Sequence, residues 1–159
     1  MKLDALIAFV LRAIAVLESA QAPALLAARL YVAQAFFLSG LTKLRSWDST
    51  LALFMDEYKV PVLPPEVAAV AGTTGELVLP VLLALGLAGR FAAAGLSVVN
   101  VVAVISLAEI APAALSQHML WGSLLVVILL WGPGRWSLDR FAMPWLQQRS
   151  AGAAYTRAA

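Results

Sequence analysis

The sequence predicts an all-α fold, a polytopic membrane four-helix bundle with an additional N-terminal amphipathic helix. Of its 159 residues, 62% are hydrophobic and 13% are charged, whereas ordinary soluble domains are about 45–50% apolar and about 25% charged. The mean hydropathy is +0.88. The apolar runs have the length of membrane-crossing helices and are too long for strands, so a soluble helical bundle is the less favoured alternative.

The charge and the cysteine content exclude several classes of function. The net charge is +2, but the basic residues flank apolar runs and form no basic stripe, which argues against nucleic acid as a partner. The sequence has no cysteine. Disulfide exchange, thiol-attached haem and cysteine-held iron–sulfur or zinc sites within this chain are therefore excluded. No phosphate-binding glycine loop, metalloprotease motif or nucleophile elbow is found.

Residues 1–22 are predicted to form an interfacial amphipathic helix that Pro23 ends. Apolar residues recur on one side of this helix at helical spacing, and charged residues cluster on another. A signal peptide is the alternative, because residues 20–22 resemble a cleavage site. Asp4 and Arg12 interrupt the regions that a signal peptide keeps basic and apolar, respectively, so cleavage is the weaker interpretation.

The segment 24–141 is predicted to cross the bilayer four times. A glycine–arginine turn, a proline turn and the sequence GPG separate or end its apolar runs. The polar and aromatic connection after the first span contains a short stretch that can form a surface helix. The expected spans are 24–44, 66–87, 91–110 and 115–131, the connection is 45–65, its short helix is 50–58, and a cytoplasmic tail covers 142–159.

Four spans place both termini on the same side of the membrane. Eight basic residues fall on that side and three on the other, so the positive-inside rule places both termini in the cytoplasm. The side of the termini carries Lys2, Arg12, Arg29, Arg90, Arg135, Arg140, Arg149 and Arg157, and the other side carries Lys43, Arg45 and Lys59.

Glu76 is the principal candidate for a catalytic residue. It is expected roughly 15 Å below the outer face, where an ionised side chain costs at least about 2.5–3.5 kcal/mol. It should therefore face the interior, find a partner or become protonated. Pro80 has no N–H, so the carbonyl of Glu76 loses its helical donor and a kink is expected. Gly72 and Gly75 allow another helix to come close.

Two cations of the first span, Arg29 and Lys43, are the other catalytic candidates. Helical spacing puts both on the face that also carries Phe36. An ion pair of either cation with Glu76 would relieve the buried charge. Lys43 is close enough to the outer surface that simple snorkelling into the headgroup region is the alternative.

Five further residues are candidates for binding a cofactor. Two amides lie at about the depth of Glu76, and two aromatic rings and a histidine lie near them or near the outer turn. Amides in membranes also hold helices together without any further role. A metal site is not predicted, because the sequence has a single histidine and no evident partner for it. The five residues are Gln34, Phe36, Asn100, His118 and Trp121.

Three segments together resemble the DoxX family of small four-helix membrane proteins. They are RLYVAQAFFLSGLTKL, GELVLPVLLALGLAGRFAA and GPGRWSLD, and the resemblance covers about 24–141. It implies a bacterial inner (plasma) membrane protein. Some members of the wider family are subunits of a thiosulfate:quinone oxidoreductase, and others are linked to redox defence or occur beside enzymes that modify metal-binding peptides.

Three hypotheses of function follow. The first is a redox-linked subunit that binds quinone in the bundle, where Glu76 supplies a proton and Arg29 or Lys43 stabilises a reduced anion. The second is a non-enzymatic membrane partner in metal-buffering or stress-response machinery, docked to a redox or peptide-modifying protein. The third is a small proton-coupled transporter that acts as a homo-oligomer, a dimer, because four helices enclose little volume.

Overall fold

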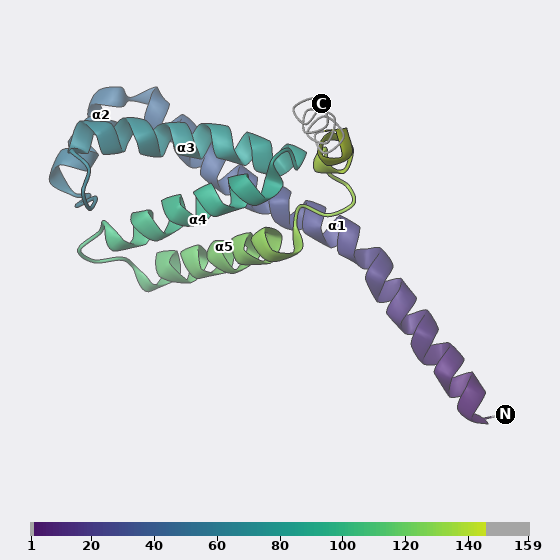
Figure 1. Ribbon diagram of the computed structural model, residues 1–159. Helices are drawn as coiled ribbons and strands as arrows, with labels where there is room; N and C mark the ends of the chain where they lie inside the picture. The colour runs from purple at the N-terminus through teal and green to yellow at the C-terminus, as the bar shows by residue number, and fades with distance from the viewer. Residues whose placement is uncertain (1, 146–159) are drawn as a thin grey trace, which may run out of the picture.

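The computed structural model describes residues 2–145, and all the regular structure in this range is helical (Figure 1). The all-α prediction is therefore confirmed. Most of the predicted tail, with Arg149 and Arg157, lies outside the described residues. The helices are α1 (Lys2–Arg45), α2 (Trp47–Asp56), α3 (Pro65–Leu85), α4 (Gly89–Ile105), α5 (Pro112–Trp131) and a short helix over 139–145.

Helix α1 continues through Pro23, so the prediction that this proline ends a separate helix is wrong. An interior proline removes one hydrogen bond and clashes with the preceding turn, at a cost of about 3 kcal/mol. Alanine and leucine surround Pro23 on both sides, and their helix propensity favours continuation. Residues 3–21 are exposed, and this half of α1 projects away from the other helices (Figure 1). Its placement at a membrane interface stays a prediction.

The second half of α1 packs against α3 and α5, and α4 packs against the same two helices. Helix α2 covers the beginning of α3 (Figure 1). One apolar core joins α1, α3, α4 and α5, and a smaller one lies under α2. The buried residues of the main core are Val32, Phe36, Leu83, Ala92, Ala93, Leu96, Leu125 and Ile128, and those of the smaller core are Phe54, Ala68 and Ala69.

The outer surface of these helices has membrane character. Helices α3 and α5 are long and apolar enough to cross a bilayer, and α4 is apolar but shorter, with 17 residues. Large apolar side chains such as Phe91 and Val98 are more than 60% exposed, which is unusual for a soluble monomer when such side chains are contiguous. Helix α4 ends at Ile105, before its predicted end, and the carbonyl of the C-cap residue Ser106 accepts the peptide N–H of Lys59 at 2.8 Å.

Gly40 sets the close approach of α1 to α3. A Cβ atom on Gly40 would lie 2.9 Å from Leu77 Cγ and 3.1 Å from Glu76 Cβ. The absence of a side chain at this position therefore brings the backbone of α1 against the turn of α3 that carries Glu76.

Gly40→Ala is expected to lower the free energy of unfolding by about 1–3 kcal/mol, because the added methyl group overpacks this crossing. Thermal unfolding in detergent, followed by circular dichroism, measures the change. Gly72→Ala is the matched control, since its Cβ would make an ordinary 3.5 Å contact with Phe54. It should be neutral or slightly stabilising. Equal losses in the two variants would contradict a special role for Gly40.

Candidate functional site

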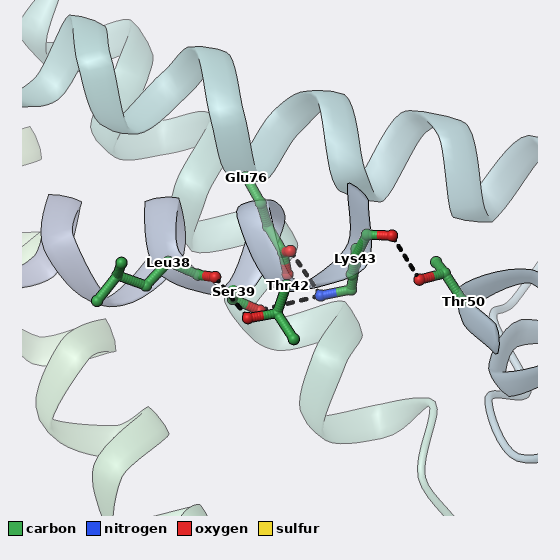
Figure 2. Close-up of polar contacts among 6 residues, drawn as sticks. All are labelled: Leu38, Ser39, Thr42, Lys43, Thr50 and Glu76. Atoms are coloured by element: carbon green, nitrogen blue, oxygen red, sulfur yellow. Dashed lines mark hydrogen bonds and ion pairs between the residues drawn. The ribbon is translucent and has the colours of Figure 1, made fainter. Parts of the chain in front are cut away.

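Lys43 and Glu76 form an ion pair between α1 and α3 (Figure 2). Lys43 Nζ lies 2.5 Å from Glu76 Oε2 and also donates to Ser39 Oγ at 3.0 Å. The two side chains are 13% and 10% exposed. Glu76 thus faces the interior, as predicted, and its partner is the nearer of the two candidate cations. Lys43 does not simply snorkel, because its ammonium group turns inward to the carboxylate.

The end of α1 that carries Lys43 is also bound to α2. Thr50 Oγ1 donates to the Lys43 carbonyl at 2.8 Å, which ties the start of α2 to the end of α1 (Figure 2).

Helix α3 continues through Pro80, whose side chain is fully buried. Pro80 offers no N–H to the Glu76 carbonyl. Glu76 therefore presents a paired carboxylate and a backbone oxygen without its usual helical donor.

A cavity of about 190 Å³ opens beside the ion pair. Lys43 and Glu76 form its polar end, and the rest of its wall is mostly apolar. Its lining comes from α2, α3, α4 and the connection before α3, so the cavity lies on the α2 side of the pair. The apolar and small lining residues include Phe54, Val60, Gly72, Val98, Val99 and Val102. The Lys43–Glu76 ion pair thus supplies the charged side chains of an otherwise mostly apolar cavity.

Tyr58 is a cavity residue that was not predicted from the sequence. Its ring meets Phe54 edge to face, with centroids 5.0 Å apart. Burial raises the pKa of Tyr58 above its usual range, and the charges of Glu76 and Glu57 raise it further. The phenol therefore stays protonated at neutral pH and can donate a hydrogen bond. The i, i+4 spacing of Phe54 and Tyr58 was the available signal, but it is also the spacing of ordinary packing.

Arg29 does not pair with Glu76. It lies 14 residues before Lys43 on α1, which is roughly 21 Å along the helix axis. The Arg29 side chain is fully buried, and its Nη2 donates to the Trp136 carbonyl. Within residues 2–145, its Nε and Nη1 find no hydrogen-bond partner. The guanidinium packs against Gly86 at the end of α3, so Arg29 holds the C-terminal segment and stands apart from the cavity.

Four of the five predicted cofactor-binding residues gather in a second cluster between α1, α4 and α5. Asn100 Nδ2 donates to the His118 carbonyl at 3.0 Å, and Asn100 Oδ1 lies 2.8 Å from His118 Nδ1. The Trp121 ring contacts both His118 and Phe36, with centroids 5.1 and 5.5 Å apart. This network joins helices in the way expected of amides in membranes.

The fifth residue, Gln34, is exposed on another face of α1, beside Pro80. None of the five predicted cofactor-binding residues lines the cavity beside the ion pair. Within residues 2–145, no three His, Asp or Glu side chains group in a way that could hold a metal ion. The lining of the cavity contains an ammonium group, a carboxylate and a phenol hydroxyl, from Lys43, Glu76 and Tyr58.

The comparisons with known proteins agree with the resemblance noted in the sequence. The family model described as DoxX matches residues 24–109, more than half of the chain. The matched range contains Lys43, Glu76 and Tyr58 and ends before α5. Neither the comparison with curated proteins nor that with solved structures gave a match.

Proposed function

Since the chain belongs to the DoxX family of membrane proteins, we propose that it is a redox-linked subunit that binds a quinone or a similar apolar carrier. In this proposal the protein crosses the bacterial inner membrane four times, with α1, α3, α4 and α5, and both termini are cytoplasmic. One observation carries it: a buried ion pair, Lys43–Glu76, forms the polar end of an otherwise apolar cavity. Intramembrane ionisable residues in such settings commonly mark functional sites.

The residues of the cavity fit a quinone head group. A quinone presents two carbonyl acceptors on a flat apolar ring, and the cavity offers the ammonium of Lys43 and the hydroxyl of Tyr58 as donors. Valine side chains of α4 supply the apolar wall. The cavity volume of about 190 Å³ lies below the roughly 300–1,000 Å³ of pockets for whole drug-sized ligands. The head group would therefore enter, and its apolar tail would remain among the lipids.

The ion pair gives the site a means of handling charge and protons. A quinone, when bound, takes up two electrons and two protons. Lys43 would stabilise negative charge on a carbonyl oxygen within hydrogen-bond reach. Glu76, a carboxylate in the ion pair, would first take up a proton from the outer connection, where Tyr58 lies, and would then pass it to that oxygen; the second proton would follow by the same route. The electrons come from a partner protein or a soluble donor.

Glu76→Gln is expected to lower the amount of quinone that copurifies with the protein about tenfold or more. Without the carboxylate that holds it, the Lys43 ammonium group loses its position as a donor to the quinone, and a hydrogen bond to a charged group contributes roughly 1.5–3 kcal/mol. Solvent extraction of the purified protein, followed by chromatography, measures the quinone per chain. Glu66→Gln is the matched control, since Glu66 is an exposed glutamate at the start of the same helix.

Tyr58→Phe keeps the ring and removes only the hydroxyl, and we expect it to lower quinone retention severalfold. A wild-type extract without quinone, together with no binding of added short-chain quinone, would overturn the proposal. Equal quinone content in the wild type and all three variants would do the same.

One feature supports the second function, that of a non-enzymatic membrane partner in metal-buffering or stress-response machinery. The first half of α1 projects with its apolar side chains exposed, as a docking helix would (Figure 1). Glu76→Gln separates the two functions, because it leaves docking through α1 unchanged while it lowers quinone binding. The proton-coupled dimeric transporter stays a prediction.

A further inference from the structure

A second hollow lies at the opposite end of the helices from the Lys43–Glu76 cavity. It is an open groove of about 670 Å³, bounded by α1, the start of α4, the end of α5 and the C-terminal segment. The C-terminal segment lies beside the end of α3 (Figure 1). This end corresponds to the predicted cytoplasmic side.

Cations dominate the polar part of this groove. Arg90 comes from the start of α4, and Arg135 and Arg140 come from the C-terminal segment. Two acids accompany them, Glu18 and Asp139. The Asp139 carboxylate already accepts the peptide N–H groups of residues 88 and 89, at 2.7 and 2.8 Å. Three guanidinium groups therefore share the groove with two carboxylates, of which that of Asp139 is already held by peptide N–H groups.

The cationic part of the groove adjoins an apolar one. Leu25, Phe91, Trp131 and Met143 line the same groove. Phe91 is 67% exposed and Trp131 is 71% exposed. Tryptophan is enriched at the level of lipid headgroups. The groove thus combines a cationic site for a negative group with an adjacent apolar surface.

The groove is fixed by contacts within the chain. Leu138 N donates to the Leu85 carbonyl at 3.1 Å, and Asp139 N donates to the Gly86 carbonyl at 2.9 Å. These bonds hold the segment that carries Arg135 and Arg140 against the end of α3. Arg90 Nη2 donates to the Leu130 carbonyl at 3.2 Å, which places its guanidinium at the end of α5.

We propose that this groove binds the headgroup of an anionic phospholipid, with an acyl chain along the surface of Phe91 and Trp131. The groove contains more arginines than acids, and the negative charge of the phosphodiester would balance this excess positive charge. Arginine binds phosphate in a bidentate manner. Basic pockets between membrane helices on the cytoplasmic side are typical sites for such headgroups. A free phosphate would use the cations but leave the apolar wall without a role.

The test uses the full-length protein in neutral phosphatidylcholine micelles, into which brominated phosphatidylglycerol is titrated. Bromine quenches tryptophan fluorescence on close approach, and Trp131 lies at the groove. Brominated phosphatidylcholine also reaches the other exposed tryptophans, so we expect saturable quenching by brominated phosphatidylglycerol that exceeds the quenching by brominated phosphatidylcholine. The double variant Arg135→Gln/Arg140→Gln should bind on the order of tenfold more weakly. The charge-conserving Arg135→Lys/Arg140→Lys should bind more strongly than the glutamine variant but more weakly than the wild type, because lysine keeps the charge and loses the bidentate geometry.

Arg45→Gln is the control for net charge, since Arg45 is an exposed arginine at the other end of α1. Its binding should match that of the wild type. If the double glutamine variant does not fold, Arg135→Gln alone replaces it, with a severalfold loss expected. Equal quenching by both lipids, or full competition by millimolar inorganic phosphate, would overturn the proposal. The second result would assign the groove to the free anion.

Discussion

Lys43→Met is expected to lower the free energy of unfolding by about 3–5 kcal/mol, the largest effect of any substitution considered in this protein. Methionine keeps the length and the apolar stem of lysine but leaves the Glu76 carboxylate buried without its partner. Breaking a buried ion pair at one side is costly for this reason, even where the intact pair adds little net stability. Thermal and denaturant unfolding in detergent measure the change.

The double variant Lys43→Met/Glu76→Gln removes both charges of the ion pair and tests this explanation. We expect the double variant to recover most of the lost stability, because the neutral amide can be buried at lower cost. Lys59→Met is the matched control: Lys59 is an exposed lysine of the outer connection, and its loss should change stability by at most about 0.5 kcal/mol. If the double variant is as unstable as Lys43→Met, the unpaired carboxylate is not the cause.

Gly86→Ala is expected to cost about 2–5 kcal/mol, the second-largest effect. Gly86 has a φ of 65°, a backbone conformation that L side chains rarely adopt. A Cβ there would overlap Nη1 of Arg29 and lie 2.5 Å from Ser137 Cβ. The substitution should therefore displace the C-terminal segment from the end of α3 and expose the peptide bond after Arg135 to trypsin. Thermal unfolding and the rate of tryptic cleavage report these two consequences.

Ala88→Gly is the matched control for the same turn. Ala88 has a φ of 49°, so glycine relieves strain there instead of adding it. The variant should be as stable as the wild type or slightly more stable, with unchanged cleavage after Arg135. A Gly86→Ala protein that unfolds and is cleaved like Ala88→Gly would show that the contact between Gly86 and Arg29 does not hold the segment.

The inward orientation of Glu76 could be predicted from the sequence, because the cost of an ionised group in a bilayer leaves few alternatives. The choice between Arg29 and Lys43 could not. Periodicity places both cations on one face of α1, but only the depth at which α1 crosses α3 selects between them. That depth depends on the close contact at Gly40, a tertiary feature that no pattern within one helix contains.

The remaining differences have similar causes. Helix α1 continues through Pro23 because the residues on both sides of the proline have high helix propensity. This propensity outweighs the helix-breaking effect of the proline. Tyr58 could not be assigned to the cavity, because its position depends on how the connection between α2 and α3 folds back over α3. The network of Asn100 and His118 required knowledge of which face of α4 meets α5.

The hydrogen bond of Arg29 to the carbonyl of Trp136 spans 107 residues of chain. The ribosome therefore completes α1, α3 and α4 before the acceptor of this buried guanidinium has been synthesised. Until then another group must solvate the cation. Final compaction is thereby coupled to the arrival of the C-terminal segment, and a polypeptide that is interrupted before this segment is left with an uncompensated buried charge.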